Sequence, residues 1–146
     1  MNAAADDIRL FHGPDGWEIL VGKTARANDV LSLKVGRPHD FWFHAAGVPG
    51  SHVLARHPDR PERCPRAVKQ LAAGLAAFFS KARAGKRVAV HWTTCKYVSK
   101  RKGLSAGKVL LGRHEAVMAE PIDPGSHPGL LPEAMAVSSL PPAHIG

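Results

Sequence analysis

One amphipathic helix constrains the fold of this chain more than any other sequence feature. Between Val68 and Ala82, apolar residues recur at spacings of three and four, while most Lys and Arg residues fall on the opposite side. Pro65 suits the first helical position, because its missing N–H would have no intrahelical partner there, and Gly85 ends the helix. A helix with one apolar face must bury that face against another layer, which the remaining chain has to supply.

Short strand patterns supply that layer. They lie at residues 17–21, 41–44, 51–54, 88–93, 107–112 and 114–120. The turn residues 47–50 predict a hairpin between the second and third of these segments. A short helix is expected from Asn28 or Asp29 through Val35. We therefore predict an α+β fold in which a mostly antiparallel sheet is packed by one long and one short helix.

The length of 146 residues suits a single domain, and 45% hydrophobic residues suffice to form a core. We place an N-terminal arm at 1–14, the domain at 15–121 and a Pro-rich flexible tail at 122–146. No apolar run is long enough to span a membrane, and the N-terminus does not resemble a secretory signal. Together with two isolated cysteines, this predicts a cytoplasmic protein without membrane contact.

Positive charge is concentrated in one part of the chain. The formal net charge is +8, and the segment from Cys64 to Arg113 contains 12 Lys and Arg but no Asp or Glu. Such a block repels itself and is suited to neutralising the phosphates of a polyanion. Nucleic acid is the first candidate partner, an anionic membrane surface is another, and a solvated basic face without a partner is the alternative interpretation.

The loop at residues 99–107 is the strongest candidate binding element. Lys96, Lys100, Arg101, Lys102 and Lys108 lie in or beside it, and glycines within it allow the backbone to approach a phosphate. An ordinary solvated loop would explain the same residues.

Contacts outside this loop are also predicted. Lys23 and Arg26 near a helix start would hold a phosphate, unless they lie in a solvated turn. Tyr97 and Trp42 would offer stacking surfaces for unpaired bases, although aromatic residues are often core residues.

Two further classes of function have sequence support. A small hydrolase or nuclease could be centred on His44, Ser51 and His52, with Asp40 as a third group, although Ser51 lacks a nucleophile-elbow motif. A basic protein-interaction module is the other. Metal ligation by His44 and His52 has no accompanying zinc-site spacing, so we expect neither a metal nor a cofactor, and no enzyme.

Several motifs along the chain match one known pattern. They are Val21-Gly22-Lys23-x-Ala25-x-x-Asn28-Asp29, Asp40-x-Trp42-Phe43-His44-Ala45, Val48-Pro49-Gly50-Ser51-His52-Val53, Phe78-Phe79-Ser80-Lys81-Ala82, Val90-x-Trp92-Thr93, Lys96-Tyr97-Val98-x-Lys100 and Gly107-Lys108-Val109. Over about residues 17–120 the chain resembles the NFACT-R domain, the RNA-binding domain of NFACT proteins.

The resemblance implies a stand-alone module that binds structured RNA such as tRNA or rRNA. Larger members of the family act in ribosome-associated quality control on the large ribosomal subunit, so that subunit is an implied partner. The matched positions nominate Lys23, Asn28, Asp40, Trp42, His44, Ser51, His52, Lys81, Lys96, Lys100 and Lys108. Our own reading of the residues adds Arg26, Tyr97, Arg101 and Lys102 as RNA contacts.

Overall fold

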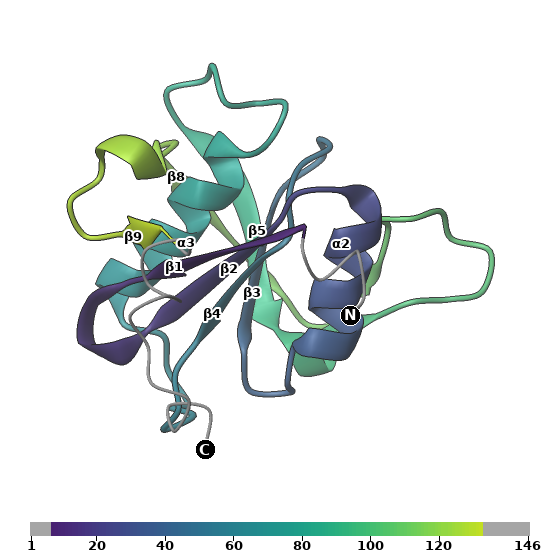
Figure 1. The fold of residues 1–146 in the computed structure, drawn as a ribbon. Helices are drawn as coiled ribbons and strands as arrows, with labels where there is room; N and C mark the ends of the chain where they lie inside the picture. Colours follow the sequence, from purple (N-terminus) through teal and green to yellow (C-terminus); the bar gives the residue numbers. More distant parts are fainter. Residues whose placement is uncertain (1–6, 133–146) are drawn as a thin grey trace.

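The computed structural model describes residues 7–132, and its centre is a seven-stranded antiparallel sheet (Figure 1). The spatial order of the strands is β8, β5, β3, β4, β2, β1 and β9. Their bounds are β1 Ile8–His12, β2 Glu18–Gly22, β3 Phe41–Ala45, β4 Val53–Arg56, β5 Val88–Thr94, β8 Glu115–Ala119 and β9 Leu131–Pro132. A separate pair joins β6 Val98–Ser99 to β7 Leu110–Leu111. The predicted α+β class is confirmed.

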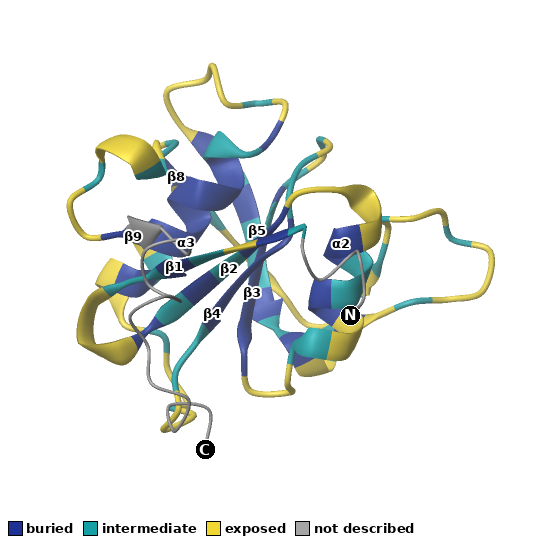
Figure 2. Cartoon of the chain, viewed as in Figure 1, coloured by how far each residue is buried: buried dark blue, intermediate teal, exposed yellow. Residues whose placement is uncertain are grey.

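Helices cover both faces of the sheet because its central strands are apolar on both sides. In β3, Phe41 and Phe43 pack in the cluster that includes α3 Arg66–Phe78. Trp42, which points the opposite way, packs in the cluster that includes α2 Ala25–Val30. Figure 2 shows buried residues along the central strands and on both helices. Fully burying a side chain as large as that of Phe43 contributes roughly 2 kcal/mol.

Short turns complete the connections between these elements. They are the π-helical turn η2 Leu31–Val35 and the 3-10 turns η1 Pro14–Gly16, η3 Cys95–Tyr97 and η4 Pro124–Ser126. Within residues 7–132, no helix is long and apolar enough to cross a membrane.

The short helix α2 begins earlier than the sequence predicted. Its N-cap is Thr24, whose side-chain oxygen accepts a hydrogen bond from the Ala27 N–H at 3.0 Å. Asn28 and Asp29, the expected caps, therefore lie inside the helix. Their side chains bond instead to backbone groups of two distant loops. The prediction missed this because Thr24, Asn28 and Asp29 can all cap a helix by residue type. The direction of the backbone decides which of them does so.

The long helix α3 ends at Phe78, although the apolar pattern continues to Ala82. Phe79 is its C-cap and leaves the helical conformation, and Ser80 forms an isolated β-bridge with Gly50. The turn between β3 and β4 thus binds the backbone that would have formed another helical turn. A tertiary contact ends the helix before its periodic pattern does.

The segment expected to be an N-terminal arm contains a strand. β1 pairs antiparallel with β2 over five residues. Ile8 packs in the cluster on the α2 face, whereas Phe11 packs in the cluster on the α3 face. The strand therefore places apolar residues on both faces, and it lacks the simple alternation that would have identified it.

The first part of the expected C-terminal tail also packs against the domain. The Ile122 N–H donates to the Gly74 carbonyl at 3.0 Å, Leu130 is buried in the core, and β9 pairs with β1. Residues 133–146 of that expected tail lie outside the described residues.

Only part of the predicted strand at residues 107–112 forms. Pairing is restricted to Leu110–Leu111 because Gly107, with φ of +82°, turns the backbone. The next predicted strand is confirmed as β8, which pairs with β5.

Candidate functional site

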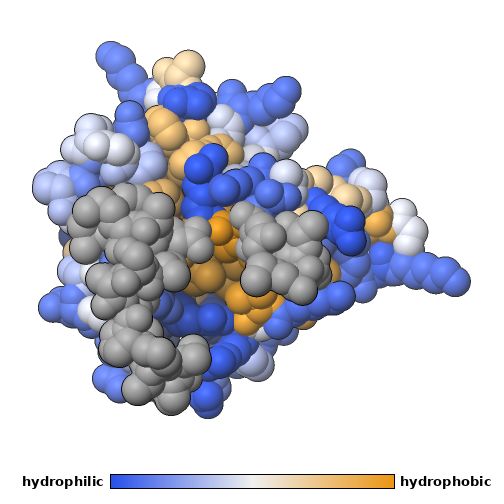
Figure 3. All heavy atoms as spheres, in the orientation of Figure 1, coloured by the Kyte–Doolittle hydropathy of each residue, from blue (hydrophilic) through white to orange (hydrophobic). Residues whose placement is uncertain are grey.

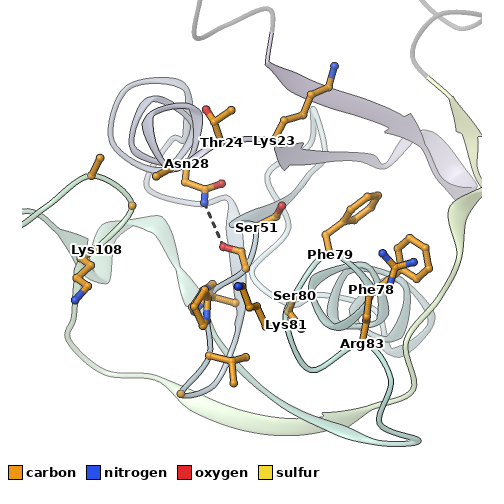
Figure 4. Close-up of a pocket in the computed structure, with 18 of the residues that line it drawn as sticks. Lys23, Thr24, Asn28, Ser51, Phe78, Phe79, Ser80, Lys81, Arg83 and Lys108 are labelled. Atoms are coloured by element: carbon orange, nitrogen blue, oxygen red, sulfur yellow. Dashed lines mark hydrogen bonds between the residues drawn. The ribbon is translucent and has the colours of Figure 1, made fainter.

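A cleft of about 830 Å³ opens where four segments that are distant in sequence meet. Its walls are the start of α2, the turn between β3 and β4, the end of α3, and the end of the basic loop (Figure 4). The lining residues are Arg9, Lys23, Thr24, Ala25, Asn28, His44, Gly47, Val48, Pro49, Gly50, Ser51, Phe78, Phe79, Ser80, Lys81, Arg83, Ala106, Gly107 and Lys108. This size matches pockets that enclose a ligand of a few hundred daltons.

The cleft is cationic. Five exposed basic residues line it and no carboxylate does, within the described part of the chain. They are Arg9, Lys23, Lys81, Arg83 and Lys108. All three lysines were predicted from the sequence as binding residues, but the two arginines were not. A cleft walled by one sign of charge concentrates ligands of the opposite sign.

Backbone hydrogen bonds join two walls of the cleft. The Ser51 N–H donates to the Phe79 carbonyl at 2.9 Å, and the Lys81 N–H donates to the Pro49 carbonyl at 3.0 Å. These two bonds fasten the end of α3 to the turn between β3 and β4.

Asn28 ties the same turn to α2. Its Nδ2 donates to the Gly50 carbonyl at 3.2 Å, and its Oδ1 accepts from the His52 N–H at 3.0 Å. Asn28 is itself buried, so the structure gives it a positioning role in the wall. Its place in the family motif is explained by these bonds.

One end of the cleft is aromatic. Phe78 and Phe79 are both half-buried, and their ring centroids lie 5.0 Å apart in a T-shaped arrangement. Arg83 lies over the Phe78 ring at 4.1 Å and Arg9 over the Phe79 ring at 5.0 Å. The apolar pattern between Val68 and Ala82 places both phenylalanines on the apolar side of the predicted helix. Adjacent residues of a helix point about 100° apart, so two neighbouring aromatic residues could have marked one as lying at the edge of the apolar face.

The basic loop between β6 and β7 is anchored at its base. Lys100 Nζ donates to Asp29 Oδ2 at 3.0 Å and to the carbonyls of Ser105 and Lys108 at 2.7 and 2.9 Å. Asp29 also accepts from the Gly107 N–H at 3.1 Å. Lys100 therefore uses its three donors on Asp29 of α2 and on two carbonyls of the loop, whereas it was expected to meet phosphate.

The tip of this loop is free to meet a ligand. Arg101 and Lys102 are exposed, and the loop projects from the body at the right of Figure 1. Figure 3 shows hydrophilic side chains projecting from the same edge of the molecule.

Trp42 and His52 lie in the core, which corrects the expectation that they face RNA. Each is only 1% exposed. Trp42 Nε1 donates to Ser32 Oγ at 2.8 Å, and Ser32 Oγ lies 2.7 Å from His52 Nδ1. The Gly107 carbonyl, 3.1 Å from His52 Nε2, can only accept, so Nε2 carries the proton of the neutral ring and Nδ1 accepts from the Ser32 hydroxyl.

Burial, reinforced by the charge of His44, lowers the pKa of His52 to about 4. The pKa of His44 is also lowered, first by burial and then by His91. Both rings are therefore neutral near pH 7. His44 lines the cleft, with its ring centroid 5.2 Å from that of His52.

The geometry of a catalytic triad is not assembled around Ser51. The ring nitrogens of His52 bond to Ser32 and Gly107 rather than to Ser51. Asp40 is paired with Arg56 at 2.6 Å and accepts from the Arg37 N–H at 2.8 Å. Among residues 7–132, no three His, Cys, Asp or Glu side chains gather as metal ligands would.

Besides the buried residues and those of the basic loop, three more predicted residues lie outside the cleft lining. Arg26 is exposed on α2. Lys96 is exposed and lies over the half-buried Tyr97 ring at 5.0 Å. These side chains would meet only a ligand that extends beyond the cleft.

Comparisons with known proteins agree on one family. The sequence model described as "NFACT protein RNA binding domain" matches residues 8–113. The "Rqc2 homolog RqcH" of Bacillus subtilis (strain 168) is 33% identical over 114 residues, which cover 78% of this chain and 19% of that protein. The protein of the same name from Streptococcus suis (strain 05ZYH33) is 37% identical over 105 residues, or 72% of this chain and 18% of that protein. The chain thus spans less than a fifth of the length of these curated relatives.

A solved structure shares the fold. It is the C-terminal part of the fibronectin/fibrinogen-binding protein from Streptococcus suis, with a TM-score of 0.72 and 35% sequence identity. The alignment covers 79% of this chain and 45% of that one.

Proposed function

The chain belongs to the NFACT protein RNA binding domain family, and from that premise we propose that it binds structured RNA such as tRNA or rRNA. The observation that carries the proposal is the continuous cationic surface formed by the cleft and the basic loop. Lys108 belongs to both, because it ends the loop and lines the cleft. Phosphate neutralisation supplies much of the affinity of such surfaces.

Different residues have different roles in this proposal. The exposed side chains of Lys23, Lys81, Arg101, Lys102 and Lys108 contact phosphates. His44 and Ser51 line the cleft and supply uncharged polar contacts. Lys100, Asn28 and His52 position the loop and the turn from behind.

In this proposal the chain binds RNA and does not catalyse a reaction. What supports it is the assignment to an RNA-binding family together with the internal hydrogen bonds of His52. A neutral, buried imidazole with both nitrogens occupied is a poor general base.

The cellular role proposed here is ribosome-associated quality control in the cytoplasm, with the large ribosomal subunit as a partner. Its support is the similarity to proteins named Rqc2 homolog RqcH. Because this chain matches only a small part of those proteins, we propose that it contributes RNA affinity to that process rather than the whole activity.

The test is a salt series of binding to tRNA, to rRNA fragments and to duplex DNA of equal length. We expect RNA-preferring binding that weakens linearly with the logarithm of salt concentration. Lys81→Gln, Lys102→Gln and Lys108→Gln should each reduce, by about one, the slope of the logarithm of RNA affinity against the logarithm of salt concentration. Lys34→Gln, which changes an exposed lysine on η2, is the control and should leave the slope unchanged. Equal, weak binding to all three polyanions would refute the proposal.

A protein partner is the second candidate, because the solved relative comes from a protein named for binding fibronectin and fibrinogen. Immobilised fibronectin and fibrinogen would test it directly. Binding to fibronectin or fibrinogen would favour this candidate if added tRNA did not displace the protein.

A further inference from the structure

We propose that the cleft receives one or two unpaired nucleotides of an RNA, at a strand end or in a loop, while the basic loop holds the neighbouring backbone. This inference rests on the proposed function and specifies the form of RNA that its central site takes. It is carried by the size of the cleft, by its combination of basic and aromatic side chains, and by the hydrogen bonds that join its walls.

The size of the cleft favours single nucleotides over a duplex. About 830 Å³ lies within the range of sites that enclose small molecules, roughly 300 to 1,000 Å³. An RNA duplex presents phosphates and 2′-hydroxyl groups on its outside and keeps its base faces stacked inside. A duplex could lie across the rim, but only an unpaired nucleotide could enter and place a base against the walls.

The walls combine the two kinds of group that a nucleotide can use, basic side chains for its phosphate and aromatic rings for its base. Lys108 lies on one side of Asn28 and the two phenylalanines lie on the other (Figure 4). A phosphate is suited to the lysines, and a base is suited to the flat surfaces of Phe78 and Phe79. Aromatic rings hold unpaired bases of any sequence, since every base has a stacking face.

The two arginines extend the aromatic part. The guanidinium groups of Arg83 and Arg9 already lie over the Phe78 and Phe79 rings at 4.1 and 5.0 Å. Guanidinium planes stack on bases as aromatic rings do and add positive charge next to a phosphate. An apolar ligand would gain nothing from these cations, so a base with an attached phosphate fits this end better.

The neutral groups of the cleft complement the edge of a base. His44 is half-buried in the wall, and burial together with His91 lowers its pKa, so it is uncharged near pH 7. One ring nitrogen hydrogen-bonds to the Gly50 backbone, so the neutral imidazole has its other nitrogen left for a ligand. The Ser51 hydroxyl lies in the same wall and can both donate and accept.

The cleft is assembled before any ligand arrives. The bonds from Ser51 to Phe79, from Lys81 to Pro49 and from Asn28 to Gly50 join three of its four walls. At Gly50, an added Cβ would lie 2.7 Å from the Ser80 Cβ, which shows how closely the turn and the end of α3 pack. Little affinity is lost to ordering the protein on binding.

The experiment compares three fluorescently labelled RNAs by anisotropy across one salt series. They are a single-stranded hexanucleotide, a blunt duplex of the same sequence, and a whole tRNA. Phe79→Leu and Phe78→Leu remove the stacking surface but keep apolar volume. We expect each to weaken hexanucleotide binding about tenfold, with little effect on the duplex. Lys102→Gln at the loop tip is the matched control and should weaken binding to the hexanucleotide and to the duplex alike.

Two safeguards keep the outcome decisive. Thermal unfolding shows whether the phenylalanine variants fold. Lys81→Gln, an exposed change in the same cleft, should lower the salt slope for the hexanucleotide by about one and leave that of the duplex unchanged.

Failure of this inference differs from failure of the proposed function. If the wild-type protein binds tRNA but the cleft variants affect hexanucleotide and duplex equally or not at all, the cleft is not a single-strand site and the RNA-binding proposal stands. If the wild-type protein does not bind tRNA, both proposals are wrong.

Discussion

His52 stands at the end of a hydrogen-bond chain that begins at Trp42 and passes through Ser32. Because the Gly107 carbonyl can only accept, Nε2 of the neutral His52 ring carries the proton and Nδ1 accepts from the Ser32 hydroxyl, whose oxygen accepts in turn from Trp42 Nε1. A proton added to Nδ1 would meet the Ser32 hydroxyl donor in a buried site. The lowered pKa of His52 therefore keeps the ring neutral, in the form that bonds to both Ser32 and the Gly107 carbonyl at the base of the basic loop.

The stability of the protein should fall on mild acidification, and His52 should account for much of the fall. The unfolded chain takes up this proton near pH 6.5, but the folded chain does so only at about pH 4. The stabilisation is complete above pH 6.5 and is lost as the pH drops towards 4. Between about pH 7.5 and about pH 5 the loss from this residue is about 2 kcal/mol.

Urea unfolding at the two pH values measures this effect. His52→Gln should be less stable at neutral pH but should lose clearly less on acidification than the wild type. His39→Gln, a change at an exposed histidine, should behave like the wild type. The same pH dependence in wild type and His52→Gln would contradict the assignment.

At the scale of elements, the loop between β6 and β7 combines a fixed base with a free tip. Asp29 on α2 accepts hydrogen bonds from both Lys100 and Gly107, so the helix and the loop are joined through a single carboxylate. This pair is partly exposed, and its ionic contribution to stability is about 1 kcal/mol or less. Its larger effect is to orient the loop beside the cleft.

Asp29→Ala separates loop order from simple charge. Removing a negative charge should strengthen binding to RNA if only net charge matters. If the order of the loop matters, binding should weaken instead, by about fivefold, because the loop must then be ordered on binding. We expect weaker binding, accompanied by faster hydrogen exchange at the Gly107 N–H. The exposed Asp59, replaced in the same way, serves as the charge control.

At the scale of the whole molecule, the two ends of the described chain meet at one edge of the sheet. β1 pairs with β9, and Leu130 contributes to the same core cluster as α3. Segments near both ends of the described chain therefore complete the sheet and the core. Both segments were expected to lie outside the folded domain.

Leu130→Ala should destabilise the fold by about 3 kcal/mol, since it leaves a cavity in that cluster. Leu110→Ala removes the same atoms from a side chain that is 40% exposed and should cost about 0.5 kcal/mol or less. Chemical denaturation of the two variants compares them directly. Equal losses would mean that the segment after residue 121 does not contribute to the core.

Local and periodic features of the sequence determined much of this protein. The apolar repeat of α3, the turn between β3 and β4, and the concentration of lysine and arginine could all be recognised from neighbouring residues. The family resemblance is confirmed by the match over residues 8–113. These features were accessible because each depends on residues close together along the chain.

The tertiary structure alone decided which of the nominated residues reach a ligand. Trp42 and His52 belong to strongly marked motifs but are buried, Lys100 bonds to Asp29 and to its own loop, and the half-buried Phe79 lines a cleft while also packing against the core. Each outcome depends on contacts between segments tens of residues apart, such as His52 with Gly107 or Ser51 with Phe79. Residue type and spacing describe what a side chain can do, but burial and hydrogen-bond partners are properties of the packed chain, so only packing determines which groups remain free.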